Sequence, residues 1–242
     1  MKCLELLRSK IGDSLRPPIR SLLVGLYADG DRLLEIGPGY QPRVLVGRNS
    51  FFVDIDFSAL KAVGGNAAVG NVEALPYPSG AFDLVCAFDV LEHVEEDREA
   101  FSEISRVLKR SSIFIFSVPL FEKYWSHFDQ MVGHMRRYHP SDLEAILEEV
   151  GFGVERFLCP RNLWAFLFEH GYAWVMVWLQ ILLDFALACL PPICRAGLYK
   201  FYALTPLNRM RRVDQVPWKE RRLSEIENRW SVIIVCRKSA NH

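Results

Sequence analysis

A chain of 242 residues, half of them hydrophobic, can bury one full core. Its 29 Lys and Arg residues balance 29 Asp and Glu residues, so no net charge attracts nucleic acid and no nucleic-acid partner is expected. The six cysteines stand singly, without a Cys-x-x-Cys pair, which argues against a structural zinc site and favours a reduced, cytoplasmic protein. Charges interrupt Met1–Arg20 every few residues, which argues against a secretory signal.

Residues 1–30 are expected to form an N-terminal helical segment. Apolar residues recur at helical spacing until Pro17 and Pro18 interrupt the pattern, and Leu22–Leu26 is predicted to be a second, short helix. The segment is interpreted as a lid or as a helix packed on a sheet. A basic amphipathic helix that touches a membrane or a partner is the alternative.

The stretch Leu33–Gln41 is an apolar run that ends in Gly-x-Gly, which is typical of a buried parallel strand followed by a tight turn. Gly37 and Gly39 allow that turn and the close approach of a ligand. Glu35 lies where a carboxylate reaches the ligand-binding edge of an open α/β sheet. A dinucleotide fingerprint is not complete, because Pro42 occupies the place of its third glycine.

A second apolar run, Phe51–Asp56, also ends in carboxylates, and Asp54 follows Glu35 by 19 positions. A carboxylate at this place can accept hydrogen bonds from both hydroxyls of a ribose. The pair of acidic strand ends therefore strengthens the prediction of a nucleotide-like ligand.

The rest of the chain alternates predicted helices and strands, which indicates an α/β fold with a doubly wound sheet. A long helix is predicted from Asp89 to Leu108, and another over Pro140–Gly151 with Ser141 as N-cap and Glu144 completing a capping box. The remaining elements are helix Phe57–Val63 and strands Ala67–Val69, Leu84–Phe88, Ser111–Val118, Phe152–Cys159 and Trp230–Arg237.

Five segments in order, Glu-x-Gly-x-Gly, Val-Asp, Gly-Asn-Val-Glu-x-Leu-Pro, Phe-Asp-Leu-Val and Leu-Glu-His-Val, resemble the class I S-adenosylmethionine-dependent methyltransferases of the small-molecule group, type 11-like. The resemblance implies a seven-stranded Rossmann-like sheet with an antiparallel last strand. The methyltransferase core is then expected at residues 31–160 and 230–238, with a hydrophobic and then basic helical insertion at 161–229.

The resemblance implies S-adenosylmethionine as the cofactor. Asn71 stands where the family has an aspartate that reads the adenine edge, and its amide carbonyl can still accept from an exocyclic amine. Gln41 replaces the family's third glycine, so the loop is expected to hold the methionine carboxylate less closely. The expected cofactor-binding residues are Glu35, Gly37, Gly39, Asp54, Ile55, Asn71, Val72, Phe88 and Asp89.

Methyl transfer needs no covalent residue, but a hydroxyl acceptor profits from a general base, for which histidine is the usual choice. His134 and His93 are the candidates. Gly-His-x-Arg-x-Tyr recurs in family members, so His134, Arg136 and Tyr138 are expected to line the acceptor pocket.

Asp89, Glu92 and His93 also resemble the acidic-His cluster of ubiquinone-type O-methyltransferases, which can hold a divalent ion. Leu-Glu-His-Val is widespread in relatives without metal as well, where the Glu and His cap the helix and pack. No metal is therefore expected.

The insertion contains the apolar stretch Trp164–Leu190, which carries Glu169, His170 and Asp184 and leaves too short an uncharged run to cross a membrane cleanly. A buried helical hairpin, an interfacial membrane-docking element and a true span remain open. The basic stretch Asn208–Arg222 fits an anionic membrane surface, a phosphorylated lipid carrier or a solvated face.

The predicted function is methyl transfer to a small-molecule, glycan or lipid-linked acceptor, at oxygen, by a cytoplasmic enzyme that could attach to a membrane. A protein or RNA methyltransferase and a non-catalytic scaffold with the cofactor fold are the alternatives.

Overall fold

The computed structural model describes residues 19–28, 32–40, 42–159 and 222–240. Residues 1–18 of the predicted lid, the turn 29–31, Gln41, residue 160 and residues 161–221 of the predicted insertion lie outside the described residues. Within the described part of the chain, no helix combines the length and the apolar composition that crossing a membrane requires.

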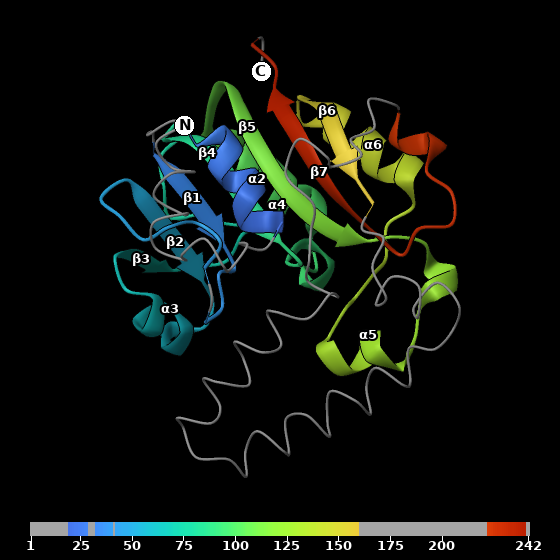
Figure 1. Ribbon diagram of the computed structural model, residues 1–242, viewed down its shortest axis with the longest axis horizontal. Helices are drawn as coiled ribbons and strands as arrows, with labels where there is room; N and C mark the ends of the chain where they lie inside the picture. Colours follow the sequence, from blue (N-terminus) through green and yellow to red (C-terminus); the bar gives the residue numbers. More distant parts are fainter. Residues whose placement is uncertain (1–18, 29–31, 41, 160–221, 241–242) are drawn as a thin grey trace, which may run out of the picture.

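Seven strands form one sheet in the order β3-β2-β1-β4-β5-β7-β6 (Figure 1). The first five strands along the chain pair in parallel, and β7 is antiparallel to both β5 and β6. This is the predicted doubly wound sheet with an antiparallel edge. The strands are β1 (Leu33–Ile36), β2 (Ser50–Asp54), β3 (Asn66–Val69), β4 (Phe82–Phe88), β5 (Leu108–Pro119), β6 (Phe152–Leu158) and β7 (Ser231–Lys238).

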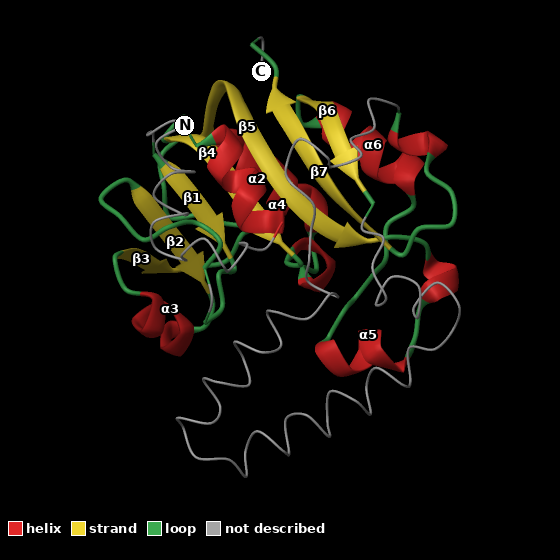
Figure 2. Cartoon of the chain, in the orientation of Figure 1, coloured by secondary structure: helices red, strands yellow, loops and turns green. Residues whose placement is uncertain are grey.

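Helices cover both faces of the sheet (Figure 2), and two buried clusters fill the layers between helices and strands. Alternate residues of β4 enter different clusters, because successive side chains of a strand point to opposite faces. α4 (Asp97–Val107) and α6 (Pro140–Glu149) pack on one face, and α2 (Ile19–Tyr27) and α3 (Phe57–Val63) on the other. The remaining helices are α5 (His127–Val132) and the short 3₁₀ helices η1 (Leu91–His93), η2 (Glu122–Tyr124) and η5 (Leu223–Glu225).

The prediction of one long helix from Asp89 to Leu108 is wrong. Asp89 has φ +56°, a left-handed conformation that a right-handed helix cannot include. The chain instead makes the single 3₁₀ turn η1 and begins α4 at Asp97. As a result, Glu92 and His93 lie on a short turn directly after β4, at the carboxyl edge of the sheet.

The predicted capping box of α6 is also wrong. Pro140 occupies the first turn, and the N-cap is His139 rather than Ser141. The Glu144 carboxylate accepts hydrogen bonds from the backbone N–H groups of Leu223 (3.3 Å) and Ser224 (3.2 Å). Glu144 therefore ties α6 to the segment that leads into β7 rather than capping its own helix.

Candidate active site

The loop after β1 has the backbone that its glycines permit. Gly37 and Gly39 have φ +63° and +54°, and Gly37 N–H donates to the Val53 carbonyl (2.8 Å). A Cβ on Gly37 would lie 2.5 Å from a methyl carbon of Val90, whereas a Cβ on Gly39 would meet open space. Gly37 thus lets the loop pack against the segment after β4, and Gly39 leaves its outer side free for a ligand.

The buried side chain of Glu35 supports the backbone of this loop. Its side chain is buried, and its carboxylate accepts hydrogen bonds from the backbone N–H groups of Arg43 (2.8 and 2.9 Å) and Val44 (2.8 Å). Burial raises the pKa of Glu35 despite these donors. The Glu35 carboxylate therefore has a structural role, because it holds the backbone of the loop. Its contact with the cofactor stays a prediction.

Asp54 ends β2 beside the same loop. Its Oδ2 accepts a hydrogen bond from Gly39 N–H (3.1 Å) and its Oδ1 from Asp56 N–H (2.9 Å). The neighbouring Ile55 side chain is 78% exposed. An open glycine, a carboxylate and an exposed aliphatic side chain are therefore together at one end of β2, which suits a ribose and its base.

Asn71 and Val72 follow β3 and differ in setting. The Asn71 amide donates to the Glu73 carboxylate (2.5 Å), and its carbonyl oxygen accepts from Glu73 N–H (3.3 Å). Val72 is buried in the core, so it offers a ligand its backbone rather than its side chain. The adenine assignment of both residues stays a prediction.

Phe88 is the last residue of β4 and Asp89 follows it. Both contact an arginine that the sequence did not single out. Arg20 of α2 donates to Asp89 Oδ1 (2.8 Å), forms an ion pair with Oδ2 (2.5 Å) and lies 5.4 Å from the centre of the Phe88 ring. Ser117 Oγ of β5 also donates to Asp89 Oδ1 (2.7 Å). The N-terminal helix therefore reaches the edge of the sheet where the cofactor's methionine end is expected.

A second cluster surrounds His134 in the loop between α5 and α6. His134 Nδ1 lies 2.7 Å from Asp129 Oδ1, and Asp129 also accepts from Arg137 Nε (2.9 Å) and Ser126 N–H (2.8 Å). Asp129 and Arg137 are buried. Although burial opposes it, hydrogen bonds from His134 and Arg137 lower the pKa of Asp129 to about 2, so this carboxylate is charged at neutral pH.

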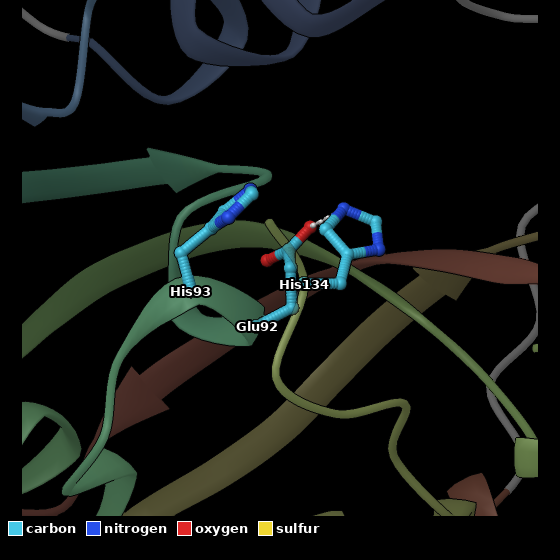
Figure 3. Close-up of side chains that lie close together, drawn as sticks. All are labelled: Glu92, His93 and His134. Carbon is cyan, nitrogen blue, oxygen red and sulfur yellow. Dashed lines mark ion pairs between the residues drawn. The ribbon is translucent and has the colours of Figure 1, made fainter. Parts of the chain in front are cut away.

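The 3₁₀ turn η1 brings Glu92 and His93 to His134 (Figure 3). Glu92 Oε1 lies 3.8 Å from His134 Nε2, and the two imidazole rings are 4.8 Å apart, edge to face. Glu92 is 1% exposed; burial, and then the charge of Asp89, raise its pKa to about 8. His93 Nδ1 is 3.0 Å from the Gly133 carbonyl, and burial lowers the pKa of His93.

The other predicted pocket residues point elsewhere. Tyr138 is 4% exposed and its hydroxyl donates to the Leu91 carbonyl (3.1 Å), so it supports η1 from the core and does not line an open pocket. Arg136 pairs with Asp97 (2.9 Å) at the start of α4. Both residues thus fix the turn that carries Glu92 and His93.

The structure brings the predicted residues together in two adjoining groups, with η1 between them. Sequence reasoning missed Arg20, Ser117, Asp129 and Arg137. Asp129 stands five positions before a candidate base, which is a signal that could have been used. The contacts of Arg20 and Ser117 join segments far apart in the chain and leave no local pattern.

A family model described as a methyltransferase domain matches residues 34–116, which contain both acidic strand ends and η1. A probable S-adenosylmethionine-dependent methyltransferase of Mycolicibacterium smegmatis is 33% identical over 88 residues, which are 36% of this chain and 34% of that protein. The chain spans less than half of the length of the curated relatives that it matches. It covers 34% of the M. smegmatis protein and 49% of an uncharacterised protein of Methanocaldococcus jannaschii.

Two solved structures resemble nearly the whole chain. A possible histamine N-methyltransferase of Thermotoga maritima has a TM-score of 0.57 at 16% identity, covering 91% of this chain and 87% of that one. Phosphoethanolamine N-methyltransferase 2 of Haemonchus contortus, in complex with S-adenosylmethionine, has a TM-score of 0.55 at 15% identity, covering 96% and 56%. At such identities the likeness shows the fold. The family model over residues 34–116, the sequence motifs and the fold agree on a class I methyltransferase domain, whose cofactor is S-adenosylmethionine.

Proposed function

We propose that the chain transfers the methyl group of S-adenosylmethionine to a hydroxyl oxygen of a small-molecule, glycan or lipid-linked acceptor, with His134 as general base. The observation that carries the proposal is the 2.7 Å contact between His134 Nδ1 and Asp129 Oδ1. A carboxylate oxygen can only accept, so Nδ1 carries the proton and Nε2 keeps its lone pair. A buried aspartate that fixes the tautomer and steadies the imidazolium is a recurrent way to equip a histidine base.

The neighbourhood of His134 supports this role. The backbone N–H of Met135 donates to the Glu92 carbonyl (2.8 Å), which holds the His134 loop against the turn that follows Asp89. A base in this loop is therefore close to the expected methionine end of the cofactor. Methyl transfer is an in-line displacement, so the residues bind and orient the cofactor and acceptor while the base takes the hydroxyl proton.

His93 is the weaker candidate for the base. Its Nδ1 lies on a backbone carbonyl rather than a carboxylate, and burial lowers its pKa. A neutral carbonyl steadies an imidazolium less than a carboxylate does. We therefore assign the proton transfer to His134 rather than to His93.

The test begins with calorimetric titration of S-adenosylmethionine and S-adenosylhomocysteine, followed by transfer of labelled methyl to phenolic, glycan and lipid-linked hydroxyls. His134→Gln should lower kcat by about 10²–10⁴-fold with little change in cofactor Kd. His139→Gln is the matched control, since His139 is exposed and contacts Ser141. Cofactor binding without turnover on any acceptor would favour a non-catalytic scaffold, and full activity of His134→Gln would remove the base assignment.

Association with a membrane surface is the second part of the proposal. Its support is the sequence of residues 161–229, apolar and then basic, most of which lie outside the described residues. In flotation with anionic liposomes, the full chain should be recovered with the liposomes. A variant in which the arginines at 209, 211 and 212 are replaced by Gln should not be. Equal partitioning of both proteins would remove the membrane part and leave the methyl-transfer part untouched.

A further inference from the structure

We propose that Glu92, His93 and His134 bind a divalent transition-metal ion through one carboxylate oxygen and the Nε2 atoms of both imidazoles. One ligand atom of each residue lies within 4.8 Å of the others. Figure 3 shows the Glu92 carboxylate between the two rings. Two imidazoles and one carboxylate are a common ligand set for zinc and for other first-row divalent ions, and the set leaves positions open for a further ligand.

Both imidazoles are held with Nε2 free. His93 Nδ1 lies 3.0 Å from the Gly133 carbonyl oxygen and His134 Nδ1 lies 2.7 Å from Asp129 Oδ1. Both oxygens only accept, so each Nδ1 carries the proton and each Nε2 keeps the lone pair that a metal needs. Histidine ligands are typically held in this way, with the second nitrogen donating to a carboxylate or a backbone carbonyl.

Glu92 supplies the independent observation. Its side chain is 1% exposed, and within the described residues its Oε2 has no hydrogen-bond partner. Leaving a carboxylate oxygen buried without a partner is costly, whether the group is ionised or protonated. A divalent ion would remove this cost, because it binds the ionised carboxylate directly. The predicted helix-capping role of Glu92 does not account for the burial, because α4 begins at Asp97, past this turn.

The ligand set differs from the Asp89, Glu92 and His93 cluster that the sequence resembles. Both oxygens of Asp89 face Arg20, and Ser117 also donates to this carboxylate. His134, from a loop some forty residues later, takes the third place instead. Metal–ligand distances of about 2.0–2.2 Å require ligand atoms roughly 3–4 Å apart, so the residues must close by less than about 1–2 Å. Within the Glu92, His93 and His134 cluster the His93 ligand group is the more exposed of the two imidazoles, and it can make this adjustment by side-chain rotation.

The proposal goes beyond the proposed methyl transfer, since ion binding needs neither cofactor nor acceptor. An ion at this place would lower the pKa of an acceptor hydroxyl that binds it. Because the ion would occupy His134 Nε2, that atom could not accept the hydroxyl proton in the metal-loaded enzyme. The ion would then activate the hydroxyl in its place. Metal-free and metal-loaded enzyme should then differ in the pH profile of kcat.

The test uses the full chain, stripped with a chelator and titrated with Co²⁺ by visible absorption and with Zn²⁺ by calorimetry. We expect one ion per chain with micromolar or tighter affinity, and Co²⁺ bands typical of a low-coordinate site. His93→Gln and His134→Gln should each weaken binding at least about 100-fold, and Asp129→Asn about 10–100-fold by freeing the His134 ring. His139→Gln, in the same region but outside the cluster, should bind as the wild type does.

Thermal unfolding in the metal-free state shows that each variant is folded before it is titrated. If His134→Gln does not fold, the partly exposed His93→Gln carries the test. Wild-type protein without a stoichiometric site below about 100 μM would overturn the proposal, as would unchanged affinity in a folded His93→Gln. Ion binding without methyl transfer would support the site and count against the proposed function alone.

Discussion

Replacing Asp129 by Asn should destabilise the protein by about 3–5 kcal/mol, the usual cost of removing one partner of a buried ion pair. Asp129 and Arg137 are both buried, and the guanidinium contacts both carboxylate oxygens, with Nη2 2.8 Å from Oδ1 and 3.1 Å from Oδ2. In the variant, Arg137 keeps its charge and loses its counterion. The carbonyls of Leu120 and Trp230, which also accept from Arg137, cannot neutralise it.

The hydrogen bonds that Asp129 accepts explain why asparagine cannot replace it without a loss of stability. Asp129 Oδ1 accepts from His134 and Arg137, and Oδ2 accepts from Arg137 and from the backbone and hydroxyl of Ser126. An asparagine has one acceptor oxygen, and its NH₂ group would face donors on whichever side it lies. The variant therefore loses the N-terminal bond of α5 or the bonds to His134 and Arg137.

Urea unfolding at pH 7 measures the effect, with Arg137→Met and the double variant closing a mutant cycle. We expect a coupling free energy of at least about 2 kcal/mol, because the double variant has no unpaired charge. Asp142→Asn on the surface of α6 is the control and should change stability by less than about 0.5 kcal/mol. A loss below about 1 kcal/mol in Asp129→Asn, or additive single effects, would refute the reasoning.

Two further predictions concern the predicted cofactor site, and a third concerns stability at acid pH. Asp54→Ala should weaken S-adenosylmethionine binding about tenfold or more in calorimetry, because ribose hydroxyls lose a charged acceptor; unchanged affinity would remove the ribose assignment. Gly37→Ala should destabilise the protein by about 2 kcal/mol or more and abolish cofactor binding, because the new Cβ collides with Val90. Gly39→Ala has no such collision and should cost about 1 kcal/mol, for the left-handed backbone alone. Equal losses of stability in thermal unfolding would contradict this. The hydrogen bond from Arg106 lowers the pKa of Glu103, so the charged carboxylate stabilises the fold above the unfolded pKa of about 4.5. This contribution is lost as the pH falls through the folded pKa. Glu103→Gln should therefore flatten the acid side of a curve of stability against pH, and an unchanged slope would count against the prediction.

The order of the core elements could be predicted because each has a local signature. Apolar runs that end in glycine or in carboxylates gave β1 and β2, and helix Phe57–Val63 was predicted with the bounds that the structure has. The errors lie at helix starts. Asp89 adopts a left-handed conformation that Ser117 and Arg20 stabilise, and neither contact is visible in the local sequence. A helical apolar pattern alone therefore placed the start of α4 eight residues too early.

The candidate site was predicted in parts rather than as a whole. His93, His134 and Glu92 were recognisable from motifs, but Glu92 was grouped with Asp89 and His93 rather than with His134. Asp129 was missed, because its contact with His134 depends on how the loop between α5 and α6 folds. Motifs identify chemically able side chains, and the pairing of those side chains depends on tertiary contacts.

One turn joins the two halves of the site, and its position follows from Asp89. The left-handed backbone there points the Asp89 side chain to Arg20 and the chain onward into η1, so that Glu92 and His93 face the His134 loop. The Tyr138 hydroxyl and the Met135 N–H then donate hydrogen bonds to the carbonyls of Leu91 and Glu92, which fixes the turn from the side of the His134 loop. Asp89, which is predicted to bind the cofactor, lies only three positions before Glu92. Cofactor binding and the geometry of the Glu92, His93 and His134 cluster are therefore expected to be linked through backbone contacts that are already present.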